Sequence, residues 1–283
     1  MTPSRPGRKS GSAGGLDWAD VVVNGVPLRD AEPWCRLIHC ARRSRSLTPG
    51  SPTYSDDVTH DRLDYDGEGL SEAQVEGRSP LEVARDWVDA AVARQAERGD
   101  VPEPLAISIA SVDADGAPNV RTVLMRFFDE RGPGFVTALT SAKGRELRAH
   151  PAVAAALTWP SMFRAIRFRG TAVQVGRDEV EAYFDSRPYG SRISAWTSRQ
   201  SEPIASRAAL EEAYERYAAQ WPDGGRADDV PVPDFWGGFR IVPDEVEFWG
   251  GRRSRLHDRI VFSRTGSGSL ADVDAWRVWR RQP

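Results

Sequence analysis

From residue 105 onward the sequence is a succession of short, strand-sized apolar runs separated by turn signals, and this pattern restricts the folds open to the chain. The runs are rich in β-branched and aromatic residues and are too short for most helices. Asp113-Ala114-Asp115-Gly116 separates the first two runs, which predicts a hairpin. Many short strands joined by turns favour a mostly antiparallel sheet or barrel. We expect strands at residues 105–112, 120–128, 134–139, 153–159, 164–175, 237–242, 245–249, 255–262 and 276–280.

Helical patterns precede and interrupt these runs. Ser79 followed by Pro80 is typical of a helix start, and Leu81, Ala84 and Trp87 continue it at helical spacing. This spacing predicts an amphipathic helix that ends at about residue 98. Strands in series with helices between them indicate one α+β domain, a mostly antiparallel barrel with peripheral helices. We expect the other helices at residues 143–150, 178–185 and 204–219.

Residues 1–60 differ in composition from the rest of the chain. They are rich in Ser, Pro, Gly and Arg and lack sustained periodicity, apart from an apolar patch at 21–28 that predicts a short strand. We expect a mostly disordered N-terminal extension, followed by a folded domain over residues 61–283. Cys35 and Cys40 flank His39, but two thiols and one imidazole lack a fourth ligand, so we expect two free thiols and no metal site.

The charge balance excludes several classes of partner. A net charge of −3 gives no general attraction to nucleic acid or to an anionic membrane, and no apolar run approaches the roughly 18–20 residues of a spanning helix. The basic N-terminus lacks the apolar core of a secretory signal, so we expect a cytoplasmic protein. Lys9 and Lys143 are the only lysines among 38 basic residues. A single arginine is therefore weak evidence for a site, whereas Lys143 is more informative.

The first candidate group of site residues is a pair of arginines on one predicted strand. Arg121 and Arg126 are five residues apart, so on a regular strand they point to opposite faces. A twisted strand could let one guanidinium reach a phosphate while the other reaches a second ligand, because arginine forks match phosphate oxygens. Two solvated arginines at a sheet edge are the alternative.

The second candidate group lies at a predicted helix start. Thr140-Ser141-Ala142-Lys143 would place free backbone N–H groups, a hydroxyl and an ammonium around one point, which suits an anion such as phosphate. The alternative is an ordinary capped helix.

The third candidate group follows a helix that we expect to break into a loop at Arg187-Pro188. Tyr183 and Arg187 are four residues apart and share one helical face, and Ser191 follows in the loop. Together they could form a second small phosphate pocket, although a purely structural role for this segment remains open.

The fourth candidate group contains three basic or titratable residues in alternation. Arg255, His257 and Arg259 would project from one face of the strand expected at 255–262. A buried strand would carry apolar residues at these positions, so the pattern indicates a ligand more strongly than the other three do.

In their order and intervals these segments resemble the pyridoxine 5'-phosphate oxidase family. The resemblance runs from about Leu63 to Pro283 and includes the Phe-Trp-Gly-Gly-Phe-Arg stretch at 235–240. It implies an FMN-binding split β-barrel and a homodimer with its two active sites at the subunit interface. It also implies that FMN accepts hydride from the substrate and is reoxidised by O2.

The resemblance implies a role for each candidate site residue. FMN would be bound by Arg121, Arg126, Thr137, Lys143, Gln200, Ser201, Trp249 and Arg259. A small phosphorylated pyridine would be bound by Arg126, Tyr183, Arg187, Ser191, Arg255 and His257. Arg255 and His257 would be the catalytic residues, Arg255 by polarising the reacting group and His257 by positioning it or accepting its proton.

Three positions depart from the family pattern. Arg126 stands where the family usually has lysine, Ala142 replaces an arginine, and Ala165 replaces a glutamine near the flavin ring. Their effects on FMN affinity and rate are left open, and the physiological substrate is open too. The expected activity is oxidation of pyridoxamine or pyridoxine 5'-phosphate to pyridoxal 5'-phosphate. One alternative is a specialised flavin oxidase of the phenazine type, acting on a reduced tricyclic substrate, and another is a non-catalytic or deazaflavin-binding split barrel.

Overall fold

A computed structural model describes residues 22–23, 26–27 and 64–283, and the chain divides into two units after Asp61. In the first unit, β1 (Val22–Val23) pairs antiparallel with β2 (Val26–Pro27), so the strand expected at 21–28 is a short strand pair. The predicted disordered extension, Cys35, His39 and Cys40 lie largely or wholly outside the described residues.

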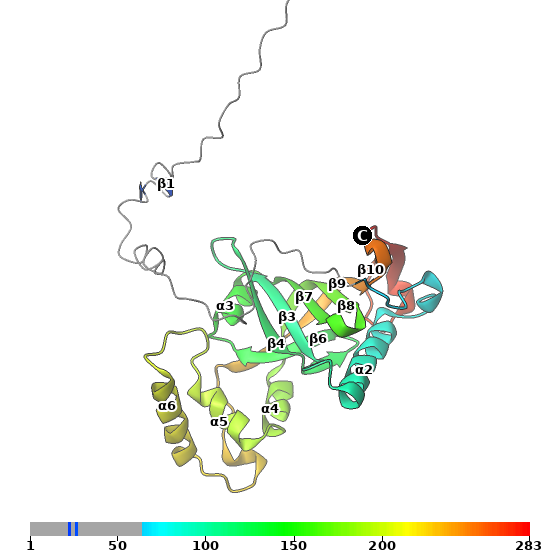
Figure 1. Ribbon diagram of the computed structural model, residues 1–283. Coiled ribbons are helices and arrows are strands. Elements are labelled where there is room, and N and C mark those ends of the chain that lie inside the picture. Colours follow the sequence, from blue (N-terminus) through cyan, green and yellow to red (C-terminus); the bar gives the residue numbers. More distant parts are fainter. Residues whose placement is uncertain (1–21, 24–25, 28–63) are drawn as a thin grey trace, which may run out of the picture. The chain divides into compact units, whose positions relative to one another are not determined.

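A single sheet of nine strands forms the second unit (Figure 1), and every pairing in it is antiparallel. Its main strand order is β11-β10-β9-β8-β7-β3-β4, while β6 pairs with β9, and β5 pairs with β6. Because β9 pairs with β8 along most of its length and also with β6 and then β10, it belongs to both parts of the sheet. The strands are β3 (Ala106–Val112), β4 (Pro118–Leu124), β5 (Phe127–Asp129), β6 (Gly132–Ala138), β7 (Ala152–Trp159), β8 (Arg164–Gln174), β9 (Trp236–Gly250), β10 (Asp258–Arg264) and β11 (Trp276–Arg280).

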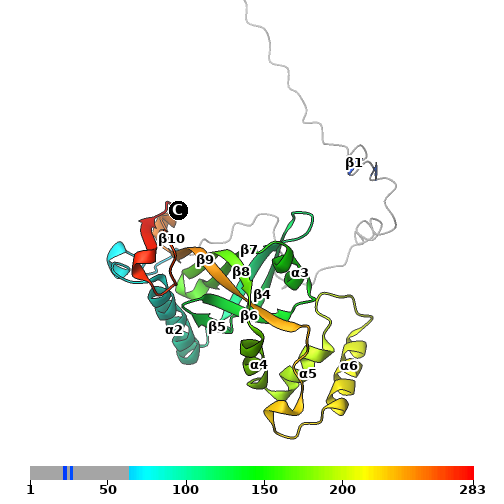
Figure 2. The same ribbon diagram turned by 180° about the vertical axis from the view of Figure 1, so that it is seen from behind.

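The helices gather at the two ends of this sheet. Both views place α4, α5 and α6 together at one end and α2 at the other, beside β10 and the C-terminus (Figures 1 and 2). Helix α2 begins with a capping box in which Ser79 and Glu82 bond each other's backbone, and it ends at Gly99 in the left-handed conformation. The helices are α2 (Pro80–Arg98), α3 (Ala142–Ala149), α4 (Arg177–Asp185), α5 (Tyr189–Thr197) and α6 (Arg207–Gln220).

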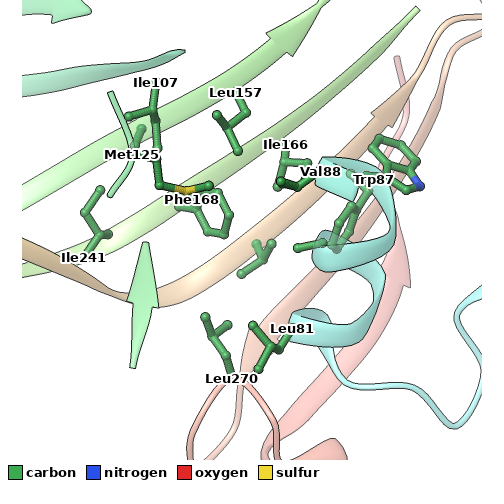
Figure 3. Close-up of a cluster of buried hydrophobic side chains, with 14 of the residues drawn as sticks. Leu81, Trp87, Val88, Ile107, Met125, Leu157, Ile166, Phe168, Ile241 and Leu270 are labelled. Carbon is green, nitrogen blue, oxygen red and sulfur yellow. The ribbon is translucent and has the colours of Figure 1, made fainter. Parts of the chain in front are cut away.

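The main core lies between α2 and the sheet. Leu81 and Trp87 of α2 belong to the same buried cluster as Ile166 and Phe168 of β8, and Leu81 lies beside Leu270 (Figure 3). The Trp87 ring meets Phe248 edge-on at 5.4 Å. A second cluster packs α4 and α5 against the start of β9 through Phe184, Ile193 and Trp236. The predicted α+β class and mostly antiparallel sheet are therefore confirmed.

Two strand predictions were wrong in their boundaries. The run at 120–128 is two strands, β4 and β5, because the chain turns inward at the buried Met125 and the Arg126 N–H bonds the Gly134 carbonyl at 2.8 Å. The runs at 237–242 and 245–249 are one strand, β9. Arg169 of β8 pairs with Glu245 and the next residue, Gly170, pairs with Pro243, so Asp244 is an extra residue that forms a β-bulge in β9 and lets the pairing continue past Pro243.

Two further predictions were wrong because of local turns. The loop expected after Arg187-Pro188 is helix α5, since a proline that ends one helix can also stand at the start of the next. The strand expected at 255–262 begins only at Asp258. Ser254 and Arg255 both have positive φ, 56° and 61°, which is incompatible with an extended strand.

None of the helices within the described residues is long and apolar enough to cross a membrane.

Candidate active site

The N-terminus of α3 gathers the polar side chains of the first candidate site. Ser141 caps the helix by accepting the Gly144 N–H at 3.2 Å. Lys143 Nζ lies 3.2 Å from Thr137 Oγ1 and 3.3 Å from Gln200 Oε1, and the Thr137 hydroxyl donates to the same glutamine oxygen at 2.8 Å. Ser201 Oγ accepts the Ala142 N–H at 3.1 Å. Residues from β6, α3 and the loop after α5 thus converge on one helix start.

Arg121 borders this group from β4 and is held by a buried acid. Its guanidinium pairs with Glu146 at 2.7 Å and also bonds Ser111, while Asn119 bonds the other carboxylate oxygen at 2.9 Å. Burial alone would raise the pKa of Glu146, but hydrogen bonds from Ser111, Asn119 and Arg121 outweigh it and lower the pKa. Glu146 therefore stays ionised and fixes Arg121 beside the start of α3.

Lys143 has an environment that favours an anion. Burial lowers the pKa of its ammonium, and the positive charge of Arg121 lowers it further. Two cations held near each other at a helix N-terminus are stabilised when a phosphate lies between them. The chemistry of this donor set fits the phosphate and hydroxyl groups of FMN.

A second group lies around a cavity of about 550 Å³ beside α4 and α5. Arg126, Tyr183, Arg187 and Ser191 all line it. Among the described residues, Arg187 Nη1 is buried and has no hydrogen-bond partner. Its guanidinium lies 4.9 Å from the Trp236 ring centroid, so aromatic faces hold it from one side. Burial lowers the pKa of Arg187, and the nearby Arg126 lowers it further.

An unpartnered buried guanidinium is costly unless an anion binds it. Arginine keeps its charge in proteins, so this cost is not relieved by loss of a proton. Tyr183 stacks parallel to Trp236 at 6.2 Å and so stands on the same aromatic support as Arg187. The lining of this cavity therefore suits an anionic group.

A third group lies at the far end of β9. The rings of Trp249 and His257 are 4.7 Å apart, and Tyr65 meets His257 edge-on at 5.3 Å. The Arg252 N–H donates to His257 Nδ1 at 3.1 Å, which leaves Nε2 to carry the proton of the neutral ring. Burial lowers the pKa of His257, and Arg255 lowers it further. The neutral imidazole is thus favoured.

The predicted common face of Arg255, His257 and Arg259 was wrong. Arg255 lies in the short 3-10 turn Arg253–Arg255 and is exposed, and His257 precedes the first residue of β10. Arg259 is in the strand, where it pairs with Glu247 at 2.8 Å. Arg259 therefore has an acid of its own chain as a partner.

The candidate residues fall into two sets in one chain. The α4–α5 cavity and the Lys143 group lie near the start of β9. Near its end lie Trp249, Arg255, His257 and Arg259. At about 3.3 Å per residue, the 15 residues of β9 span up to about 50 Å. A single chain does not bring all the predicted residues together.

Four further residues support the candidate side chains and were not predicted as site residues from the sequence. Glu146 and Glu247 hold site arginines from the core side, Trp236 supports Arg187, and Tyr65 covers His257. Glu247 sits in a strand among apolar neighbours, and a buried acid at such a position signals an internal cation partner. Of the departures, Ala142 is the first residue of α3, and Ala165 lies opposite Trp249 in the sheet.

Two family models match the chain. Residues 94–221 match "Pyridoxamine 5'-phosphate oxidase", and residues 236–283 match "Pyridoxine 5'-phosphate oxidase C-terminal dimerisation region". A pyridoxamine 5'-phosphate oxidase-related, FMN-binding protein of Nostoc punctiforme has the same fold, with a TM-score of 0.53 at 16% identity over 70% of this chain and 97% of that one. Fold and site thus define a flavin-binding split-barrel oxidase.

The relatives narrow this class. The pyridoxine/pyridoxamine 5'-phosphate oxidase of Streptomyces avermitilis is 44% identical over 80% of this chain and 98% of its own length, and that of Kineococcus radiotolerans is 45% identical over 78% and 97%. The chain belongs to the pyridoxine/pyridoxamine 5'-phosphate oxidase family. The match to the dimerisation region indicates a homodimer. Among solved structures, PhzG of Burkholderia lata in complex with tetrahydrophenazine-1-carboxylic acid shares 28% identity and a TM-score of 0.65 over 77% of this chain and 99% of that one.

Proposed function

We propose that this protein oxidises pyridoxamine or pyridoxine 5'-phosphate to pyridoxal 5'-phosphate, with FMN as cofactor and O2 as electron acceptor. The observation that carries this proposal is the buried, unpartnered Nη1 of Arg187 in a cavity separate from the Lys143 group. Two anion sites match two phosphate-bearing molecules, a cofactor and a substrate. A substrate without an anionic group would leave Arg187 unpaired.

In this proposal Lys143, Thr137 and the start of α3 hold the FMN phosphate, while Gln200 and Ser201 bind its neighbouring polar groups. Arg121, fixed by Glu146, adds a second positive charge. When bound, FMN supplies the hydride acceptor. The protein supplies placement and electrostatics, and burial beside aromatic rings excludes water from the reacting groups.

Arg187, Tyr183 and Ser191 bind the substrate phosphate, and Arg126 adds charge at the mouth of the same cavity. Arg255 orients the reacting substituent of the pyridine. His257, held neutral with Nδ1 accepting the Arg252 N–H, offers its other nitrogen to the substrate.

The separation of the two residue sets along β9 supports an active site shared between two subunits. In the homodimer, the α4–α5 cavity and Lys143 group of one chain would face Trp249, Arg255, His257 and Arg259 of the other. Each dimer would then have two equivalent sites, each containing both halves.

A second candidate function is oxidation of a reduced tricyclic compound, as in the phenazine-type oxidases. The likeness to PhzG and the loss of polar side chains at Ala142 and Ala165 favour it. The ligand of PhzG carries a carboxylate, which could also pair with Arg187, so Arg187 alone does not separate the two candidates. The presence of Tyr183 and Ser191 beside Arg187 in the same cavity favours the phosphorylated substrate, because a phosphate accepts more hydrogen bonds than a carboxylate.

The test is reduction of the bound flavin under anaerobic conditions. Pyridoxine 5'-phosphate should bleach the flavin absorbance, and added O2 should restore it with formation of pyridoxal 5'-phosphate. Arg187→Ala should raise the KM for the phosphorylated substrate by about a hundredfold, the scale of a lost charged hydrogen-bond pair. Arg207→Ala, which removes an exposed arginine of α6, is the matched control. Bleaching by a dihydrophenazine but not by pyridoxine 5'-phosphate would establish the second candidate instead.

A further inference from the structure

The segment before α2 lies against the proposed catalytic histidine. Residues 64–71, which we call the strap, have no regular secondary structure. Tyr65 of the strap meets His257 at 5.3 Å, Phe163 at 4.9 Å and Trp249 at 6.1 Å, each edge-on. A segment without its own hydrogen-bond ladder needs outside partners to hold an aromatic ring in such a position.

Asp258 provides those partners. Its Oδ2 accepts the N–H of Leu70 at 2.9 Å, and its Oδ1 pairs with Arg280 of β11. Arg252 lies 3.5 Å from the same carboxylate and donates to the Glu68 carbonyl at 3.0 Å, while Arg280 donates to the Leu70 carbonyl at 3.1 Å. One largely buried carboxylate thus organises two arginines and a backbone N–H around the end of the strap.

Gly69 shows that the strap is shaped to fit this carboxylate. Its φ is +75°, and a Cβ there would lie 2.4 Å from Asp258 Oδ2 and 2.7 Å from Arg252 Cδ. Only glycine permits both the backbone conformation and this close approach. The contact is therefore specific and not a loose surface pairing.

We propose that Asp258 is a positioning residue that acts through the strap: it fixes residues 68–70 and thereby holds Tyr65 against His257. The proposal rests on the proposed function, because it takes His257 as a substrate-contacting group. Asp258 follows His257 in the sequence, yet its carboxylate contacts the strap and the C-terminal strand. The effect on the reaction passes through Tyr65.

The first test measures amide hydrogen exchange in the full-length dimer and does not depend on which substrate is used. Asp258→Ala and Gly69→Ala should each raise exchange across residues 64–71 by about tenfold, the scale of one hydrogen bond to a charged group, while α2 and β3 keep theirs. Glu72→Gln, which removes another partner of Arg280 but not the Leu70 bond, should leave the strap unchanged. Equal exchange in Asp258→Ala and the parent, or an equal rise in Glu72→Gln, would overturn the proposal.

The second test separates positioning from general destabilisation by a double-mutant cycle on the FMN-loaded enzyme. Asp258→Ala and Tyr65→Ala should each raise KM about tenfold with much smaller changes in kcat, and the double variant should be no worse than Tyr65→Ala alone. Asp258→Asn, which keeps an acceptor for the Leu70 N–H, should recover part of the loss. Fully additive effects would contradict action through Tyr65. Failure of pyridoxine 5'-phosphate as substrate would instead count against the proposed function and leave the exchange result standing.

Discussion

At the scale of single residues, the proposed site depends on positive charges that the protein partly shields from solvent. Lys143, Arg121 and Arg187 are each partly buried. Lys143 bonds the Thr137 hydroxyl, Arg121 pairs with Glu146, and Arg187 lies over the Trp236 ring. Such cations contribute little to stability but bind anions strongly, because water competes poorly for them.

Lys143→Ala should weaken FMN binding by about tenfold to a hundredfold, since it removes one charge-assisted hydrogen bond at a helix start. Burial, and then Arg121, lower the pKa of Lys143, so affinity for FMN in the parent should decline with rising pH already below the ordinary lysine value of 10.5. Quenching of FMN fluorescence measures both. Arg145→Ala, the exposed cation two residues further along α3, is the control and should bind FMN as the parent does.

His257 should remain neutral to a pH below its ordinary pKa of 6.5, because burial, and then Arg255, lower the pKa. A base with a lowered pKa loses its neutral form only as the pH falls through that lower value, so the acid limb of kcat/KM should lie below 6.5. The chain has four histidines, so an NMR titration can be assigned with His257→Asn. A titration midpoint at or above 6.5 would contradict this expectation.

At the scale of elements, the sequence predicted most strands and helices because their periodicity is local. The hairpin of β3 and β4, helix α2 and the short α3 all follow from turn residues, caps and alternation within each segment. The continuity of β9 could not be predicted, because it depends on a bulge at Asp244 that forms only against Arg169 and Gly170 of β8, which lie far earlier in the chain. The positive φ values of Ser254 and Arg255 also could not be predicted, because neither residue is glycine, the residue that usually adopts this conformation.

Gly170 lies opposite this bulge and allows the backbones of β8 and β9 to approach closely there. A Cβ there would lie 2.1 Å from the Val242 carbonyl oxygen, so Gly170→Ala should destabilise the protein by about 1–3 kcal/mol through a forced backbone shift. Gly266→Ala is the matched control, because its Cβ would meet nothing within 4 Å. Urea unfolding of the two variants measures the difference, and equal midpoints would show that β8 and β9 move apart without cost.

At the scale of the whole molecule, the sequence correctly predicted an α+β split barrel, and its likeness to the oxidase family pointed to the residue groups proposed here to bind anions. Local patterns alone could not show that these groups lie at both ends of one strand. The buried partners Glu146 and Glu247 were also missed, because their role is defined only by the strands that pack against them.

Deletion of residues 1–60 should leave the folded domain intact, since the sheet, its core and the proposed site residues all lie in the second unit. The shortened chain should bind FMN with the affinity of the parent and unfold at the same urea concentration. Loss of FMN binding on deletion would assign the extension a role in the site.

The span of β9 has a genetic consequence. If the two ends of this strand serve different active sites of the dimer, a subunit with Arg187→Ala and a subunit with His257→Ala are defective in opposite halves. Co-expression of the two defective chains should then restore about a quarter of the parental activity at low substrate concentration. Random pairing makes about half of the dimers mixed, and each mixed dimer has one of its two sites with both halves intact. Complementation between two mutant alleles would thus follow directly from the length of β9.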